Sequence, residues 1–292
     1  MHVTEEDDHV RVDVLDRVSG QMLCYRAQYV VGADGGKTVG PKLGIELDGV
    51  RNLRKIISVH FKADLSQYWD DRVGIAHFAN PELGLGMKSG SMLPLGPTWG
   101  RHSEEWQMHF AIDADKPSPP REDAVRRVRE LLKLPDFNME ILSFSSWTLE
   151  RVLANEYRKG RVFIGGDAAH RHPPTTGLGL NTAVQDAHNL AWKLSYALKN
   201  KAQLNLLDTY EVERRAIGKR NCDWALFTSK CHLIIGAAIG LQNGQPDANK
   251  EHLTRLFDAQ SETGRAGLAQ LQHVIDGQAI EFHAHNLDLG FC

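Results

Sequence analysis

One stretch, residues 160–181, constrains the fold of this chain more than any other part of its sequence. It begins with the apolar run Val162–Ile164, and two glycines and Asp167 follow directly. A short apolar run that ends in Gly-Gly-Asp predicts a buried strand whose carboxyl end presents a single acid.

The residues after this acid predict a loop and then a helix. Residues 170–176 contain a Pro-Pro pair, which excludes regular helix there. Gly177 and Gly179 allow the backbone to approach a large ligand closely. We expect a helix from Thr182, with Asn181 as its N-cap. A carboxylate, a glycine-rich loop and the free amides of a helix N-terminus together suit a polyhydroxylated, partly anionic cofactor.

A second strand with a terminal acid lies near the start of the chain. Alternating valines over residues 10–14 and the run 29–31 predict strands. The second run leads into the sequence GADGG at 32–36, which contains Asp34 and Gly35. The overlapping sequence GGKT ends like a phosphate-binding Walker loop, but Val31 stands where that loop needs its first glycine, so we reject a nucleotide triphosphatase.

The middle of the chain predicts a layer of strands with one covering helix. The expected strands are centred on residues 56–61, 74–78, 87–95, 106–112 and 140–149. The helix should be capped by Ser118, with Pro119 at its first position. Such a layer can cover one side of a small-molecule binding site, and an ordinary sheet-and-helix core fits the same pattern.

Helices dominate the rest of the sequence. Residues 182–199 are amphipathic, residues 205–241 predict one long helix, and residues 250–292 predict helix followed by loop. The later part of the long helix is apolar enough to pack against a second subunit, as in a homodimer, or against a missing domain, and a core helix is an equally good interpretation.

The sequence HRHPPTTGLGLNTAVQDAHNLAWK at 170–193, with the strand and acid before it, resembles the second flavin-contacting motif of the FAD-dependent aromatic hydroxylases that share the p-hydroxybenzoate hydroxylase fold. Within that group it is most similar to the phenol and chlorophenol monooxygenases. The segment 32–36 resembles the Asp-Gly motif of the same enzymes. The resemblance implies an α/β protein with a partial FAD-binding domain, Rossmann-like and three-layered, an inserted sheet-and-helix substrate domain and a C-terminal helical segment.

The resemblance also implies a domain division and a cofactor site. The FAD-binding domain should comprise residues 1–40 and 156–200, the substrate domain residues 41–155, and the helical segment residues 201–292. FAD is the implied cofactor, NAD(P)H the electron donor, and a phenol or related small aromatic the substrate. The implied cofactor-binding residues are Asp34, Gly35, Asp167, Pro173, Gly177, Gly179, Leu180 and Asn181. We name no catalytic acid or base.

Each of these residues has an implied role. Asp167 should hydrogen-bond the ribityl chain, and Pro173 with Pro174 should line the face of the flavin where oxygen reacts. Leu180 and Asn181 should present backbone amides to the pyrimidine edge of the isoalloxazine. The Asp-Gly motif should lie near the pyrophosphate and help to place the nicotinamide donor.

The sequence departs from the family chiefly in that it contains no Gly-x-Gly-x-x-Gly segment of the kind that holds the FAD pyrophosphate. We therefore expect an N-terminally truncated chain that binds FAD weakly or not at all. Two alternatives stay open: a non-catalytic truncated member that acts as a partner chain, and another flavoenzyme of the same fold, such as a halogenase or an alkene-reducing enzyme.

Composition excludes some further classes of function. The net charge of −3 and the lack of a basic run argue against nucleic acid as the main partner. The four cysteines form no CxxC pair, and His170, His172, His283 and His285 have no acid or thiol at ligand spacing, so we expect no metal. The most apolar window, residues 233–241, is shorter than the roughly 20 residues that span a bilayer. We expect a cytoplasmic protein.

Overall fold

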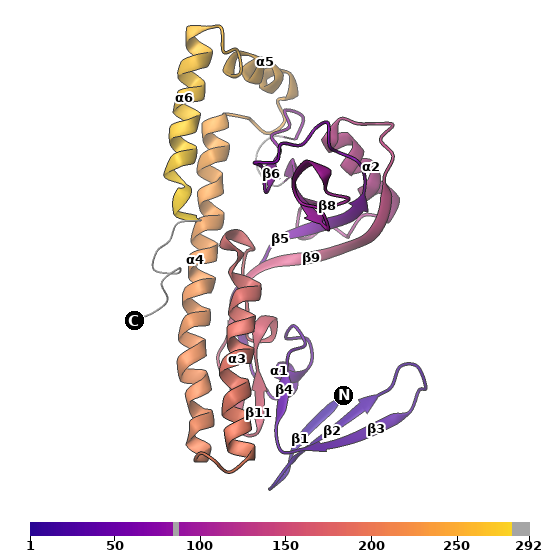
Figure 1. The fold of residues 1–292 in the computed structure, drawn as a ribbon, viewed down its shortest axis with the longest axis vertical. Helices are drawn as coiled ribbons and strands as arrows, with labels where there is room; N and C mark the ends of the chain where they lie inside the picture. The colour runs from indigo at the N-terminus through magenta and orange to yellow at the C-terminus, as the bar shows by residue number, and fades with distance from the viewer. Residues whose placement is uncertain (84–87, 282–292) are drawn as a thin grey trace. The chain divides into compact units, whose positions relative to one another are not determined.

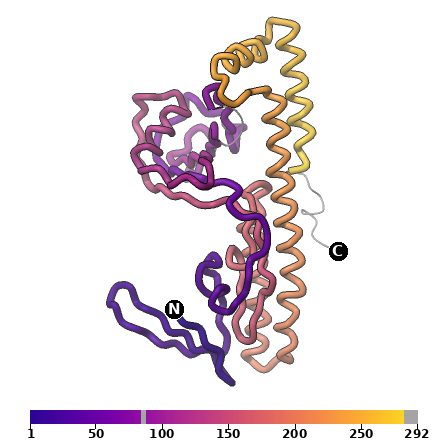
Figure 2. The backbone as a smooth tube through the Cα atoms, turned by 180° about the vertical axis from the view of Figure 1, so that it is seen from behind, coloured from indigo at the N-terminus to yellow at the C-terminus, as the bar shows by residue number. Residues whose placement is uncertain are grey.

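A computed structural model describes residues 1–83 and 88–281, and it divides into two compact units (Figures 1 and 2). The first unit comprises Met1–Arg51 and Glu150–Ser229, and the second comprises Asn52–Leu149 and Lys230–Cys292. The long helical segment predicted after residue 201 is thus shared between the units. We describe each unit by itself.

Two small sheets form the strand layer of the first unit. The strands β1 (His2–Glu5), β2 (Val10–Leu15) and β3 (Met22–Ala27) make an antiparallel meander, and β2 is the strand that the alternating valines predict. In the second sheet, β11 (Val162–Ile164) lies between β10 (Arg158–Lys159) and β4 (Val30–Gly32). β11 and β4 are parallel, with Phe163 opposite Val31. Parallel pairing brings the carboxyl ends of both strands, and the two predicted acids, to the same edge.

Helices pack on the β4–β11 sheet of the first unit. The short helix α1 (Val39–Lys42) follows β4, and α3 (Leu178–Leu198) leads through η5 (Leu204–Asp208) into α4 (Thr209–Ile239), whose residues after 229 belong to the second unit. Within the first unit, α3 and α4 lie side by side in both views (Figures 1 and 2). This arrangement confirms an α/β fold.

The helix α3 begins four residues earlier than the sequence predicted. Gly177, in the left-handed region at φ 67°, occupies the N-cap position, so the prediction that Asn181 is the N-cap was wrong. Asn181 lies in the first turn, and its side-chain amide donates to the carbonyl of Gly177 at 2.9 Å. The helix can start here because glycine adopts a positive φ at little steric cost.

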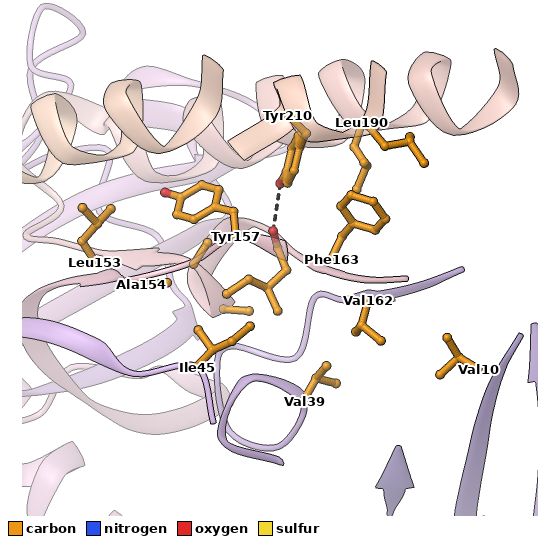
Figure 3. Close-up of a cluster of buried hydrophobic side chains, with 14 of the residues drawn as sticks. Val10, Val39, Ile45, Leu153, Ala154, Tyr157, Val162, Phe163, Leu190 and Tyr210 are labelled. Carbon is orange, nitrogen blue, oxygen red and sulfur yellow. Dashed lines mark hydrogen bonds between the residues drawn. The ribbon is translucent and has the colours of Figure 1, made fainter. Parts of the chain in front are cut away.

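The core of the first unit lies on both faces of β11, with Tyr210 and Leu190 of the two long helices on one face and Val39 and Ile45 on the other (Figure 3). Every side chain of β11 is buried, and Phe163 packs edge-on against Tyr210 of α4 with ring centroids 5.9 Å apart. The Tyr210 hydroxyl donates to the carbonyl of Ile164 at 2.9 Å, which is the dashed line in Figure 3. The end of β11 is therefore fixed to α4 immediately before the Gly-Asp sequence.

A sheet of strand order β12-β9-β5-β8-β7-β6 contains the strands of the second unit. Its strands are β5 (Leu47–Lys62), β6 (Ala76–His77), β7 (Ser91–Gly96), β8 (Glu105–Ile112), β9 (Glu140–Ala154) and β12 (His170–Arg171). β12 and the ends of β5 and β9 belong to the first unit by residue number. In β8 the side chains of Trp106, Met108 and Phe110 are buried on one face, which confirms the period-two pattern. The expected strand at 87–95 begins with Met87, which lies outside the described residues.

Helix α2 (Arg121–Leu132) covers this core through Ala124, Val128 and Leu131. Its predicted start was wrong, because Pro120 occupies the N-cap position in an extended conformation. The residue before a proline is disfavoured in helix, so Pro119 cannot begin one. Ser118 instead donates from its hydroxyl to that of Ser146 at 2.7 Å.

The second unit ends in two helices beside the last turns of α4 (Figure 1). They are α5 (Pro246–Leu256) and α6 (Glu262–Gly277), followed by η6 (Ala279–Glu281). No helix in residues 1–83 and 88–281 combines the length and hydropathy that crossing a membrane requires.

Candidate functional site

The predicted acid at the end of β11 lies in a sharp turn, which we call the Gly-Asp turn (residues 165–169). Gly166 has φ 59° and opens the short helix η3 (Gly166–Ala168). A Cβ on Gly165 would lie 2.9 Å from the Tyr210 hydroxyl, so the packing requires glycine there. Asp167 is exposed, and its carboxylate has no hydrogen-bond partner within the described part of the chain. The turn therefore presents a free carboxylate, as the sequence predicted.

The residues after this turn form the proline loop (residues 172–177), which α4 holds in place. Pro173 is buried and Pro174 is exposed. The Thr175 hydroxyl donates to the carbonyl of Ala225 at 2.7 Å, and the Thr228 hydroxyl donates to that of Thr175 at 3.0 Å. Two contacts with one helix fix the loop just before α3.

The first turn of α3 offers unengaged backbone amides. The first N–H groups of a helix have no intrahelical partner, and no side chain of residues 1–83 or 88–281 caps this end. Leu180 is 76% exposed. A Cβ on Gly177 would meet no described heavy atom within 4 Å, and one on Gly179 would meet only His172. Open space at two glycines and a helix N-terminus form a cradle suited to an anionic or hydrogen-bond-accepting group.

The second predicted acid, Asp34, lies in what we call the Asp-Gly turn (residues 34–38). Its carboxylate accepts hydrogen bonds from the backbone that follows it. It accepts hydrogen bonds from the N–H groups of Gly36 at 3.0 Å, Thr38 at 2.7 Å and Val39 at 2.8 Å. Burial alone would raise the pKa of Asp34, but these three bonds lower it overall. Asp34 thus shapes the turn before α1, and its contact with a cofactor stays a prediction.

A buried ionic cluster that the sequence analysis missed lies beneath the Gly-Asp turn. Asp186 of α3 accepts hydrogen bonds from His170 Nε2 at 2.7 Å, from the N–H of Gly166 at 3.1 Å and from Arg214 Nε at 2.8 Å. Burial would raise the pKa of Asp186, but these partners lower it. The sequence signal was an acid on the buried face of α3, four residues from both Thr182 and Leu190.

His172 carries a buried nitrogen without a protein partner. Its Nδ1 lies 3.0 Å from the Pro173 carbonyl, and a carbonyl only accepts, so Nδ1 holds the proton. Burial lowers the pKa of His172, so the ring is neutral and its Nε2 is an acceptor. Nε2 has no hydrogen-bond partner among the described residues. It is therefore an unsatisfied acceptor inside the first unit.

These groups fit a flavin nucleotide. The free, exposed carboxylate of Asp167 can accept hydrogen bonds from a polyhydroxylated chain. The amides at the start of α3 can donate to carbonyl or anionic oxygens. By contrast, no group of His, Cys, Asp and Glu that could hold a metal ion occurs in residues 1–83 and 88–281, and His283 and His285 lie outside them.

Known flavoproteins are similar to this chain in sequence and in fold. A family model described as an FAD binding domain matches residues 1–225. The chain belongs to this FAD-binding family. It is 33% identical, over 98% of its own length, to a phenol 2-monooxygenase of Pseudomonas sp. (strain EST1001), and 31% identical over 98% to a 2,4-dichlorophenol 6-monooxygenase of Cupriavidus pinatubonensis. The resemblance to the FAD-dependent aromatic hydroxylases is thus confirmed.

A solved member of the group has a closely similar fold. The flavin-dependent monooxygenase PieE, crystallised with FAD and substrate, has a TM-score of 0.85 at 32% identity and covers 99% of this chain. The match takes up 50% of PieE, 46% of the phenol 2-monooxygenase and 48% of the dichlorophenol enzyme. This FAD-binding family member therefore spans about half the length of these relatives.

Three aromatic side chains of the second unit, Phe61, Phe78 and Trp147, are of the kind that can pack on a substrate ring, and all three are part of the packing of this unit. Phe61 is fully buried and meets Phe137 edge-on at 6.4 Å, and Phe78 packs against the same core. Trp147 is partly buried and donates from Nε1 to the Ser58 hydroxyl at 3.0 Å. Core packing accounts for all three rings, and their contact with a substrate stays a prediction.

Proposed function

We propose that this chain forms the flavin-holding part and the substrate-covering layer of an FAD-dependent monooxygenase that hydroxylates a phenol or related aromatic with NAD(P)H and oxygen. The observation that carries the proposal is the unengaged Asp167 carboxylate at the end of β11, in the same unit as the uncapped first turn of α3. Family membership and the names of the relatives support the choice of cofactor and reaction.

The residues of the first unit would bind and orient the cofactor. Asp167 would accept hydrogen bonds from the ribityl hydroxyls, and Pro173 would line the face of the ring system that reacts with oxygen. The N–H groups at Leu180 and Asn181 head a helix, whose dipole favours negative charge, so they would stabilise charge at the pyrimidine edge. When bound, FAD supplies the electron transfer and the oxygen chemistry.

The Asp-Gly turn would serve the electron donor and the pyrophosphate. Its Asp34 carboxylate is occupied by backbone N–H groups, so the turn would act through its shape and through Gly35 rather than through a free charge. The strand layer of the second unit would exclude water from the aromatic substrate.

A second candidate function is a chain that holds flavin, or a partner, without catalysis. The observation in its favour is that the 292 residues contain no Gly-x-Gly-x-x-Gly segment. The rate of NADPH oxidation by purified protein with excess FAD, measured with and without a phenol, distinguishes the two candidate functions. The proposal expects phenol or chlorophenols to stimulate NADPH oxidation and to yield a hydroxylated product. Flavin binding with no phenol-dependent oxidation would favour the second candidate.

A further inference from the structure

Arg171 contacts both of the turns that carry the predicted acids. It lies on β12, where it pairs with Val152 of β9. Its Nη1 donates to the carbonyl of Gly35 in the Asp-Gly turn at 2.7 Å and, at 3.4 Å, to that of Asp167 in the Gly-Asp turn. One guanidinium therefore joins two segments that lie more than 130 positions apart in the sequence.

Glu150 of β9 orients this guanidinium from the other side. Its carboxylate lies 2.9 Å from Nε and 2.8 Å from Nη2 of Arg171. The side chains of Arg171 and Glu150 are 25% and 13% exposed. An ion pair near the surface contributes little by itself, so the value of this one lies in the direction that it imposes on the remaining donor.

The site requires arginine rather than any cation. Arginine has five N–H donors in one plane. Nε and Nη2 can donate to a carboxylate while Nη1 donates to two carbonyls. Lysine presents a compact ammonium on a flexible stem and cannot hold both geometries together. Gly36 leaves room for the guanidinium of Arg171, because a Cβ at position 36 would lie only 2.9 Å from Nη1.

We propose that Arg171 is a positioning residue that holds the Asp-Gly turn and the Gly-Asp turn at a fixed separation. By binding the backbone carbonyl of Asp167, it limits the directions in which the carboxylate of the same residue can point. Its consequence for cofactor binding rests on the proposed function, whereas the link between the turns does not. The alternative is that Arg171 and Glu150 form an ion pair that stabilises the unit as a whole.

The first test needs no cofactor. Hydrogen exchange is measured on the amides of residues 34–39 and 165–169 in the unaltered protein and in R171M, R171K and R151M. Arg151 is the matched control, because it lies on the adjacent β9, pairs with Asp223 and contacts neither turn. We expect exchange in both turns to rise about tenfold in R171M, less in R171K, and not in R151M. No change in either turn, or the same change in R151M, overturns the proposal.

The second test concerns the cofactor. We expect R171M to weaken FAD binding about tenfold, and to weaken it much less when Asp167 is already alanine, because Arg171 acts through Asp167. Additive losses in the double variant would overturn this link and indicate general stabilisation. If the unaltered protein binds no FAD while R171M loosens both turns, the proposed function fails and the positioning role of Arg171 stands.

Discussion

His170 and Asp186 face each other inside the first unit, with Nε2 of the histidine 2.7 Å from a carboxylate oxygen and the two side chains 1% and 2% exposed. The same oxygen accepts the N–H of Gly166, and the other oxygen accepts Nε of Arg214. The negative charge of Asp186 is thus compensated from β12, from α4 and from the Gly-Asp turn. This pairing connects the core of the unit with the backbone that presents Asp167.

Replacing Asp186 with asparagine should therefore destabilise the protein strongly. The variant keeps the size of the side chain but leaves the buried Arg214 without its carboxylate, and breaking a buried pair in this way costs about 3–5 kcal/mol. Chemical denaturation of D186N measures the loss. D48N, at an exposed acid of the same unit, is the control and should change stability by less than about 0.5 kcal/mol. A loss below about 1 kcal/mol in D186N would show that the cluster is not a major source of stability.

Stability should fall as the pH is lowered below about 6.5. Burial lowers the pKa of His77, His109 and His172 from the ordinary value of 6.5. For a histidine with a lowered folded pKa, the unfolded chain binds protons first, so stability is complete above 6.5 and declines as the pH falls towards the folded value. Denaturation curves between pH 7.5 and pH 5 test this.

The contribution of His172 to this pH dependence can be isolated. In His172, burial and the charge of nearby His170 lower the pKa, while the Pro173 carbonyl and Asp167 oppose them. H172Q keeps a hydrogen-bonding side chain without a titrating ring, so we expect its stability to depend less on pH between 6.5 and 5. An unchanged slope in H172Q would contradict the assignment of a neutral buried His172.

Gly165 should not tolerate a side chain. A Cβ there would lie 2.9 Å from the Tyr210 hydroxyl, and that hydroxyl is held by the carbonyl of Ile164. We expect G165A to lose about 1–3 kcal/mol of stability, the usual cost of overpacking. Y210F removes the obstructing oxygen and by itself should cost about 1 kcal/mol. The double variant should lose less than the sum of the two losses, and simple additivity would contradict the proposed clash.

The chain should discriminate little between FAD and FMN. Most of its predicted contacts, made by Asp167 and the first turn of α3, serve the ribityl and ring half of the cofactor. Only the Asp-Gly turn would lie near the pyrophosphate, and the sequence has no Gly-x-Gly-x-x-Gly segment to hold that half. We expect the two dissociation constants to agree within about tenfold, which is 1.4 kcal/mol. Isothermal titration with each nucleotide checks this, and a preference for FAD far beyond that ratio would indicate a separate adenosine site.

Alternation and short apolar runs in the sequence predicted several individual strands and the position of the acid after β11. The strands β2, β8 and β11 follow from alternation or from a short apolar run, and the acid after β11 follows from its glycines. The parallel pairing of β11 with β4 then brings both acids to one edge. The strands themselves need only the period of a strand, whereas the pairing of β11 with β4 was not predicted and comes from the structure.

The missed features depend on partners distant in sequence or on backbone detail. No residue near Asp186 in the sequence indicates that its partner is Arg214, which lies 28 positions later on the next long helix. The link from Arg171 to Gly35 likewise requires the fold itself. The start of α3 at Leu178 was missed because an N-cap was sought among polar side chains, whereas Gly177 fills that position through its positive φ. The hydrogen bond from the Gly36 N–H to the Asp34 carboxylate could have been predicted as an Asx turn.

The central claim is that the Gly-Asp turn holds a flavin through Asp167, and titration of FAD into the 292-residue chain tests it most directly. We expect saturable binding with a dissociation constant of about 1 µM or weaker, because only part of the cofactor is contacted. Loss of a charge-assisted hydrogen bond costs about 1–3 kcal/mol, so D167A should bind about 5- to 150-fold more weakly. D48A should bind like the unaltered protein. Equal affinity for FAD in D167A, D48A and the unaltered chain, with the fold intact, would contradict the account.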